Sequence, residues 1–581
     1  MPSYVPNATQ TTEPVESRTV ESAALEFRTL KTRVNDLEDA VEAEDVKDLR
    51  VPEASIAAVP DVATRAGKVL GFNASGDPIA IAVSGVDDPS LRADLAASGG
   101  AGLVGYLPAG TGAVATTVQS KLRESVSMKD FGAVGDGSDE TIKVQAVLNS
   151  GAKRVVVPAG RVFGVTGLVL ADGQTLEILG TIKKLSGGSP IIVMGNSSKV
   201  IGTGEIDGNS VTCDGVFMAE KTDVEISGLY IHHVGGKGIA TYTSGADVVI
   251  HSNRLANVGQ QAISLEYVAG AAITNNRVDT ALHGIQWWGG DSNTSNVPGT
   301  FAIKVVGNNV TNVMGGIWGS LGQNITVTGN HVENCSDVGI DFEGCFDFTC
   351  TGNTAYECEN GCYSVFYGAQ RGVFSNNSAR NVISNGSGFY ATTNGVYKNE
   401  RLVISGNTFS TKGTCIYADQ NANRSLSTSV ISGNHLLSTG GSSAITILQN
   451  EKLQIHGNNV TTVGSKIGIQ LQAVSHSSIR DNDIAGFNDP STAPGAAGGI
   501  WLYQQSASLS SQFNTVRGNR IDSFAYSITD ECPSDVTKSN NDIQHNSLTN
   551  VYRTAGAGYT GVVANNYYIY SPAMTIPATI F

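Results

Sequence analysis

Two carboxylates stand one residue apart in the segment GIDFE, at Asp341 and Glu343. If this segment is a β-strand, side chains at i and i+2 share a face, with backbones roughly 7 Å apart. Cleavage of a glycosidic bond needs one carboxylic acid to protonate the leaving oxygen and one carboxylate to act on the sugar or its water. A separation of about 6.5–9.5 Å leaves room for that water and implies inversion. The pair is a candidate for hydrolysis, and the alternative is that both groups are merely solvated.

Segments like GIDFE, with a small residue before an apolar one, recur along the chain and align with one another. Because strand side chains alternate, the residue after the apolar one and the residue two further on form two outer columns. The first column reads Ala240, Ser264, Gln286, Trp318, Asp341, Ser364, Tyr390, Tyr417, Thr446, Gln470 and Trp501. The second reads Tyr242, Glu266, Trp288, Ser320, Glu343, Phe366, Thr392, Asp419, Leu448, Gln472 and Tyr503. Three of the four tryptophans lie on these columns. A face that only meets solvent does not require tryptophan.

Rings beside amides and carboxylates are typical of sugar-binding surfaces, because apolar sugar faces stack on the rings and polar groups bind the hydroxyls. We predict a saccharide groove here, and the alternative is a subunit interface, which also favours aromatic residues. The predicted substrate-binding residues are Trp288, Trp318, Gln286, Tyr390, Tyr417 and Asp419. Glu266 is a further catalytic candidate, although three coils of about 4.8 Å would separate it from the pair by roughly 14 Å. Glu266 or Asp419 would then bind substrate or join a site across a subunit boundary.

A repeated motif, apolar-x-Gly/Asn-Asn-x-apolar, predicts the fold that carries these columns. Its asparagines are Asn253, Asn276, Asn308, Asn330, Asn353, Asn377, Asn407, Asn434, Asn458, Asn482, Asn519 and Asn546. The commonest gaps are 22 to 24 residues, one coil of a parallel β-solenoid with about three short strands. Each asparagine is expected in a turn, stacked on the asparagine of the next coil. A sandwich with many Gly-Asn turns would not keep twelve copies in register.

An apolar column stands five residues after these asparagines, and it is expected to face the core. Cys335 and Cys358 belong to it, so stacked core thiols are favoured over metal ligands or a disulfide. Eight cysteines in 581 residues are also too sparse for a disulfide scaffold.

The segment from Thr19 to Ala43 is predicted to be helical, because it lacks Gly and Pro and carries a heptad seam. The seam residues are Val20, Ala23, Phe27, Leu30, Val34, Leu37 and Val41. A short oligomerising coiled coil is favoured over an amphipathic helix packed on the rest of the chain, and the seam fits two or three strands. Farther on, Val69 to Val83 has two apolar runs around a turn sequence, which predicts a hairpin.

Composition excludes several functional classes. The formal net charge is −15, whereas a nucleic-acid binder needs a basic face. No apolar run approaches 18 residues, so no transmembrane helix or membrane insertion is expected. The N-terminus lacks a basic region followed by an apolar one, so no secretory signal is expected. With 68 glycines and only 15% charged residues, the chain favours turn-rich β-structure.

The segment SKLRESVSMKDFGAVGDGSDET, from Ser120 to Thr141, resembles the start of the pectate-lyase-like β-helix domain of bacteriophage tailspikes and capsular polysaccharide depolymerases. IGTGEIDGN, from Ile201 to Asn209, resembles an early coil of pectin-degrading hydrolases, and the N-terminal region is similar to virion-attachment segments. The resemblance implies an all-β chain with a single right-handed parallel β-helix, assembled as a homotrimer. It also implies attachment to a phage tail or baseplate protein, a place on the virion, and action on bacterial surface polysaccharide. Only 15 residues follow Asn566, so no large C-terminal trimerising domain is expected.

The predicted organisation has four parts. They are an attachment segment with the coiled coil at 1–50, a neck with the hairpin at 51–127, the catalytic or receptor-binding β-helix at 128–566, and a short end at 567–581. The favoured function is glycoside hydrolysis of capsule, exopolysaccharide or O-antigen, with no cofactor and no metal. A polysaccharide lyase is the second hypothesis, although the outer columns hold no Lys, Arg or His; His232, His233 and His283 lie on flanking turns. A non-catalytic binding fibre is the third.

Overall fold

In the computed structural model, residues 25, 27–34, 57–82, 89–419, 424–440, 443–464, 466–487, 498–504, 511–524, 526–531, 541–548, 553–555, 562–564 and 567–568 are described. The chain divides into two compact units, Met1–Thr117 and Val118–Phe581. Each is described by itself.

The first unit holds short helices and one clear hairpin. Residues 27–34 are helical, and Phe27, Leu30 and Val34 are all exposed. Leu37 lies outside the described residues, and the coiled coil stays a prediction. The elements are α2 (Val62–Arg65), β1 (Lys68–Phe72), β2 (Pro78–Ala82), α3 (Pro89–Ala96), η1 (Gly100–Gly102), β3 (Gly105–Tyr106) and β4 (Thr116–Thr117). β1 and β2 pair antiparallel around a turn in which Asn73 Oδ1 accepts hydrogen bonds from the N–H groups of Ser75 and Asp77.

The second unit begins with α4 (Val118–Leu122), η2 (Met128–Phe131) and α5 (Thr141–Leu148). Of these, η2 and α5 pack against the first strands of a solenoid and close its N-terminal end. Ser127 and Asp130 form a capping box on η2, which satisfies backbone N–H groups at its start. The buried Glu140 carboxylate accepts hydrogen bonds from the N–H groups of Val134 and Gly135, 2.5 and 2.7 Å long. These contacts give Asp130 and Glu140, two acidic residues of the motif from Ser120 to Thr141, a structural role.

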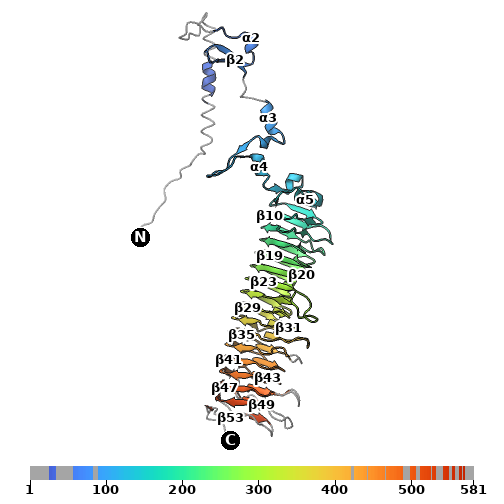
Figure 1. Cartoon of the computed structure of the whole chain (residues 1–581), viewed down its shortest axis with the longest axis vertical. Coiled ribbons are helices and arrows are strands. Elements are labelled where there is room, and N and C mark those ends of the chain that lie inside the picture. The colour runs from blue at the N-terminus through green and yellow to red at the C-terminus, as the bar shows by residue number, and fades with distance from the viewer. Residues whose placement is uncertain are drawn as a thin grey trace, which may run out of the picture. The chain divides into compact units, whose positions relative to one another are not determined.

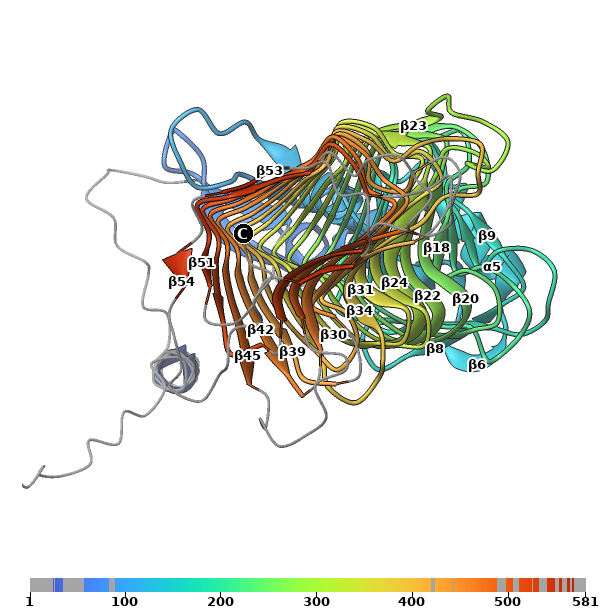
Figure 2. The same ribbon diagram turned by 90° about the horizontal axis from the view of Figure 1, so that it is seen from below.

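The rest of the unit is a right-handed parallel β-solenoid of about 16 turns, as predicted. Its coils stack along one axis from β10 to β53 (Figure 1), and an end-on view shows the strands of successive coils superimposed (Figure 2). The strands form three parallel sheets, named A, B and C here. Sheet A consists of β5 (Val126–Ser127), β7 (Arg154–Val157), β10 (Thr175–Ile178), β13 (Lys199–Gly202), β16 (Thr222–Ser227), β19 (Gly245–His251), β21 (Val268–Thr274), β23 (Thr300–Val306), β25 (Gly322–Gln323), β26 (Thr326–Thr328), β29 (Thr349–Thr351), β32 (Val373–Ser375), β35 (Val403–Ser405), β38 (Val430–Ser432), β41 (Gln454–His456), β44 (Ser478–Arg480), β47 (Thr515–Arg517), β50 (Asp542–Gln544) and β53 (Val562–Ala564).

Sheets B and C follow sheet A in each coil. Sheet B consists of β6 (Asp136–Asp139), β8 (Val162–Val165), β11 (Thr181–Lys184), β14 (Glu205–Asp207), β17 (Tyr230–Val234), β27 (His331–Cys335), β30 (Thr354–Cys358), β33 (Ser378–Asn381), β36 (Thr408–Thr411), β39 (His435–Ser438), β42 (Asn459–Val463), β45 (Asp483–Phe487), β48 (Arg520–Asp522), β51 (Ser547–Leu548) and β54 (Tyr567–Tyr568). Sheet C consists of β9 (Leu168–Val169), β12 (Ile192–Val193), β15 (Val216–Phe217), β18 (Ile239–Ala240), β28 (Val338–Glu343), β31 (Gly361–Phe366), β34 (Ser387–Ala391), β37 (Ile416–Ala418), β40 (Ile445–Leu448), β43 (Ile467–Gln472), β46 (Gly498–Tyr503), β49 (Tyr526–Glu531) and β52 (Arg553–Ala555). Three long strands run through the bend and belong to both sheets: β20 (Arg254–Glu266), β22 (Arg277–Trp288) and β24 (Asn309–Ser320).

The core fills the space between the three sheets with stacked apolar columns. The inward column of sheet C is completely buried and consists of Ile239, Ile263, Ile285, Ile317, Ile340, Tyr363, Phe389, Ile416, Ile445, Ile469 and Ile500. Each such side chain contributes about 1.5–3 kcal/mol through burial. Cys335 and Cys358 are buried and free next to the bend, which confirms that they are core thiols.

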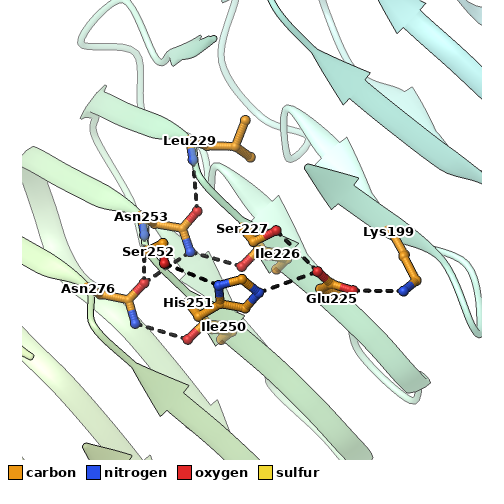
Figure 3. Close-up of polar contacts among 10 residues, drawn as sticks. All are labelled: Lys199, Glu225, Ile226, Ser227, Leu229, Ile250, His251, Ser252, Asn253 and Asn276. Atoms are coloured by element: carbon orange, nitrogen blue, oxygen red, sulfur yellow. Dashed lines mark hydrogen bonds and ion pairs between the residues drawn. The ribbon is translucent and has the colours of Figure 1, made fainter. Parts of the chain in front are cut away.

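The repeated asparagines form a continuous ladder of hydrogen bonds along the solenoid. Figure 3 shows one step, where Asn253 Nδ2 donates to Ile226 O in the preceding coil and to Asn276 Oδ1 in the next, at 2.9 and 3.0 Å. Its Oδ1 accepts a bond from the Leu229 N–H. The same pattern links every asparagine of the repeat from Asn253 to Asn546. The predicted stacking of these residues is confirmed.

Candidate active site

The strand register of sheet C confirms that the predicted outer columns exist. In the first column, Trp318 pairs with Asp341, Asp341 with Ser364, and Ser364 with Tyr390. In the second column, Ser320 pairs with Glu343 and Glu343 with Phe366. Parallel pairing of β22, β24, β28 and β31 therefore brings residues more than 20 positions apart into one row on the outer face.

Asp341 faces away from the core but is not open to solvent. Its strand neighbours Ile340 and Phe342 lie in the core, so alternation directs Asp341 to the opposite face. We expected an exposed carboxylate, yet Asp341 is only 1% exposed, whereas Glu343 is half-buried. The buried Asp341 Oδ1 has no hydrogen-bond partner.

Further buried polar atoms without partners lie on three nearby strands, β22, β24 and β31. They are Ser320 Oγ, Ser364 Oγ, Trp318 Nε1 and His283 Nδ1. Buried polar groups are almost always hydrogen-bonded, so several unpartnered ones in one place need an explanation. Donors and acceptors gathered in this way are suited to the hydroxyl groups of a ligand or to bound water.

Both carboxyl groups hold their protons more tightly than usual. Burial raises the pKa of Asp341 well above its ordinary range, and the neighbouring Glu343 charge raises it further. Burial has the largest effect on Glu343 and, together with the negative charges of Asp337 and Asp291, raises its pKa to about 7. The two groups interact, so they titrate as a pair. Perturbed carboxyl groups of this kind are frequent in active sites.

Aromatic side chains line the face on both sides of the pair. On one side the Trp318 ring lies 5.1 Å from the His283 ring and 6.2 Å from the Trp288 ring, edge to face with the latter. On the other side Tyr390 and Tyr417 are stacked at 5.6 Å, and Tyr390 meets Phe366 edge to face at 5.5 Å. Burial lowers the pKa of His283, so its imidazole is neutral at physiological pH.

Two loops meet over the ends of β28 and β31, and we call them the arch. They are residues 289–299, which follow β22, and residues 392–402, which follow β34. Asn394 Nδ2 donates a 3.2 Å hydrogen bond to Asn293 Oδ1, which joins the loops across 101 residues. Gly344 and Gly368, which follow β28 and β31, leave no room for a Cβ: it would lie 2.9 Å from Ser292 Cβ and 2.6 Å from Tyr397 Cβ, respectively. The arch therefore packs directly beside Glu343 and helps to bury it.

The remaining predicted residues lie farther from the pair. Register places Glu266 beside Trp288, then Ser320, then Glu343, which is three coils as expected. Gln286 pairs with Trp318 and is 6% exposed. The Asp419 carboxylate accepts hydrogen bonds from the hydroxyls of Tyr417 and Thr392, both 3.3 Å long.

Sequence reasoning missed a cation that reaches this face. Lys237, a buried residue before β18, forms an ion pair with Glu266 and lies 3.2 Å from Ser264 Oγ. Its Nζ is also 4.1 Å from the centre of the Tyr242 ring. The ion pair balances the negative charge of Glu266. No repeated sequence pattern indicates this pair, because Lys237 lies on a turn. It favours substrate binding over acid–base chemistry for Glu266.

A groove of about 1100 Å³ runs along the bend between sheets B and C, beside the pair and not over it. Its lining includes the acidic residues Asp279, Glu333, Glu357 and Glu359, with Arg277 as the basic residue. The only group of three or more possible metal ligands within 4.8 Å in the described part of the chain lies elsewhere, at Asp207, His232 and His233 on sheet B.

A family model described as "right handed beta helix region" matches residues 159–301 and 387–568, together more than half of the chain. The chain belongs to the right-handed β-helix family. A second model, that of the periplasmic copper-binding protein NosD, matches residues 283–460. No curated protein matches this β-helix protein.

Several solved structures resemble the β-helix protein at low sequence identity. A tailspike of E. coli bacteriophage HK620, in complex with a pentasaccharide, is 13% identical and covers 83% of this chain and 87% of its own, with a TM-score of 0.30. A Thermotoga maritima exopolygalacturonase is 12% identical over 63% of this chain and 89% of its own, with a TM-score of 0.32. The A-module of an Azotobacter vinelandii mannuronan C-5 epimerase is 14% identical over 77% and 100%, with a TM-score of 0.25. Among the described residues, none of the helices has the length and apolar character that crossing a bilayer requires.

Proposed function

We propose that this β-helix protein is a polysaccharide depolymerase that hydrolyses glycosidic bonds with Asp341 and Glu343. The observation that carries the proposal is a pair of interacting carboxyl groups with raised pKa values, placed between aromatic side chains and among unpartnered buried polar atoms. Glycoside hydrolysis is the reaction that uses two carboxyl groups in different protonation states on one face.

Burial assigns a role to each member of the pair. Asp341 is the more deeply buried and keeps its proton, so it is the general acid that protonates the leaving oxygen. Glu343 is half-buried with a pKa of about 7, so it is the group that loses its proton first and activates water. A backbone separation near 7 Å for residues at i and i+2 suits the inverting arrangement. Activity then rises as the pH passes about 7 and falls when Asp341 also ionises.

The surroundings favour a glycan without a dense negative charge. Four carboxylates line the neighbouring groove against Arg277, which disfavours a polyuronate in that groove. Elimination across a uronate needs a base, usually with a cation for the sugar carboxylate. Lys237 is already paired with Glu266, and burial raises the pKa of Tyr242, which makes that phenol a poorer base. These features favour hydrolysis over a lyase reaction.

The proposed setting is the phage virion, acting at the host surface. It rests on the resemblance of residues 120–141 to the start of tailspike β-helix domains. In this proposal the N-terminal region attaches to the phage tail, three chains associate, and the sheet C face binds capsule, exopolysaccharide or O-antigen.

Depolymerisation of purified bacterial surface polysaccharides tests the proposal. The wild-type protein is expected to release new reducing ends, and mass analysis is expected to show products that have gained one water per bond cut. Asp341→Asn and Glu343→Gln are nearly isosteric, and each is expected to lose at least about 10²-fold in rate while glycan binding survives. Glu124→Gln, an exposed carboxylate paired with Lys121, is the matched control and keeps full activity.

The outcomes separate the hypotheses. Products with ultraviolet absorbance of an unsaturated uronate would identify a lyase. Binding without any cleavage would identify a receptor-binding fibre. If both carboxamide variants keep wild-type rates, the carboxylates do not act in catalysis, and Glu266 and Asp291 become the next candidates. Trp318→Ala is expected to weaken binding, because it removes a ring on which sugar stacks.

A further inference from the structure

A second cluster of reactive side chains lies on sheet B, in earlier coils than the carboxylate pair. Asp207 is the last residue of β14, and its register partner in the next coil is His232 on β17. His233 follows with a positive φ of 52°, which breaks the alternation of the strand. As a result the two adjacent imidazoles face each other, with their Nδ1 atoms 2.7 Å apart.

The donor atoms of these three residues converge on one point outside the core. Asp207 Oδ1 lies 3.8 Å from His232 Nδ1, and one donor atom from each of the three residues lies within 4.8 Å of the others. An ion about 2.1 Å from each donor would hold them roughly 3–3.5 Å apart. Small side-chain rotations that move the two Nδ1 atoms apart and bring Asp207 Oδ1 closer to them would produce these distances. His233 is exposed, so solvent has access to the remaining coordination positions.

We propose that Asp207, His232 and His233 bind a first-row divalent cation of the zinc class through Oδ1 and the two Nδ1 atoms. Two imidazoles and one carboxylate are a donor set for such ions, with water completing the coordination. Calcium and magnesium prefer all-oxygen sites, so they are not the expected ions. The proposal does not depend on the proposed hydrolase activity.

The groups around the cluster are those that a metal-binding histidine needs. His232 Nε2 is buried and has no hydrogen-bond partner, and Glu205 Oε2 lies 3.8 Å away. A metal on Nδ1 fixes the proton on Nε2, where a slight movement of the Glu205 carboxylate completes the bond; such carboxylate–histidine pairs support metal sites. Tyr230 stacks on the His232 ring at 4.3 Å and limits its rotation.

Other groups that contact the cluster compete with a bound cation. Lys183 Nζ lies 3.6 Å from Asp207 Oδ2, and the Asn209 N–H donates to Asp207 Oδ1 at 2.8 Å. Both leave a lone pair of the carboxylate for a cation, but Lys183 opposes a second positive charge. The alternative is a metal-free network in which one imidazole donates to the other. The site lies outside residues 283–460, which match the copper-binding family model.

Metal binding by the full-length protein tests this inference. Protein stripped with a chelator is dialysed against Zn²⁺ and its metal content is measured, with about one ion per chain expected. Co²⁺ in place of Zn²⁺ is expected to give the visible absorption of a nitrogen-ligated ion, which solvent-exposed acidic groups do not produce. An excess of Ca²⁺ or Mg²⁺ is expected to leave both signals unchanged.

Variants locate the site. Asp207→Asn keeps the size of the side chain, and His233→Asn suits the positive φ, so both are expected to fold with an unchanged metal-free melting temperature. Each is expected to weaken Zn²⁺ binding at least about tenfold. His251→Gln is the matched control, because His251 also faces a carboxylate, Glu225 at 3.4 Å, but has no third donor. No bound Zn²⁺ in the wild type, or equal binding in all variants, overturns the proposal.

Discussion

The protonation of Glu343 links the chemistry of the site to the stability of the fold. Its folded-state pKa of about 7 is raised from 4.5, so the folded protein binds the proton more tightly than the unfolded chain. The contribution of Glu343 to stability is then highest at low pH and falls as the pH rises from about 4.5 to 7. Destabilisation of the fold at the working pH is a common cost of a functional group, which is the role proposed for Glu343.

Glu343→Gln should therefore make the protein more stable at pH 8, by about 1–3 kcal/mol, because the amide removes a charge that is unfavourable in this buried position. The difference should disappear near pH 4, where the wild-type carboxyl is protonated in both states. Thermal unfolding measured across this pH range checks the expectation. Lower stability of the variant at pH 8 would show that the charge is well solvated.

Alternation and repeat spacing were enough to predict which side chains share the outer face, including Trp318, Asp341 and Tyr390 in one column. They were not enough to predict that Asp341 is buried or that Lys237 neutralises Glu266. Both facts depend on which side chains pack on the outer face, and Lys237 reaches it from a turn, whose conformation the repeat does not determine. Strand alternation determines only whether a side chain points toward or away from the core. Its exposure to solvent depends on which other side chains cover that face of the sheet.

At the scale of elements, the asparagine ladder should be a main determinant of coil stability. Asn308→Ala removes a side chain that donates to Ile273 O and Asn330 Oδ1 and accepts from the N–H of Asn276. Several buried groups then lose their partners, at about 1–3 kcal/mol each. We expect a clearly lower melting temperature and loss of hydrogen-exchange protection in the flanking coils.

The adjacent Asn309 is the matched control for this substitution, because its side chain is exposed on β24. Asn309→Ala should change stability by less than about 0.5 kcal/mol. Equal effects of the two substitutions would contradict the structural role of the ladder.

The arch should determine how strongly Glu343 is buried. Asn394→Ala removes the hydrogen bond to Asn293 and loosens the two loops over β28 and β31. Water then reaches Glu343, and its pKa should fall from about 7 toward 4.5. The measurement is the pH profile of depolymerisation, whose acidic limb should move to lower pH. Lys398→Ala, which changes an exposed residue of the same loop, serves as the control, and an unchanged limb in both variants would show that the arch does not bury Glu343.

The elements were predictable to different degrees. Twelve asparagines, most often 22 to 24 residues apart, predicted the coils and their turn, because one residue type with one hydrogen-bonding role recurs in each coil. The long strands β20, β22 and β24 were not predicted: three short strands per coil were expected, but β20 continues through the bend with a register shift between Val258 and Gln261. A bend that is absorbed by irregular pairing leaves no turn residue in the sequence to mark it.

At the scale of the whole molecule, the heptad seam predicts association through the N-terminal helix, and the resemblance to tailspikes implies that three copies associate. Phe27, Leu30 and Val34 are 73%, 61% and 50% exposed on the helix of residues 27–34, and covering them gives association its hydrophobic driving force. Sedimentation of the full chain should show three copies at micromolar concentration. Leu30→Asp combined with Val34→Asp should convert the assembly to a smaller species, whereas a wild-type monomer would contradict the prediction.

The arch also has a consequence for the order in which the chain folds. Ladder neighbours are 22 to 37 residues apart, so coils can join one after another, each on the last. Asn293 and Asn394 are separated by 101 residues, and their contact spans the coils that contain β24, β28 and β31. Closing so long a segment is entropically unfavourable until those coils are stacked. The arch is therefore assembled after the strands beneath it, and until then water has access to Glu343, which lies directly beside it. The burial of Glu343 is therefore completed only after the coils that contain β24, β28 and β31 have stacked.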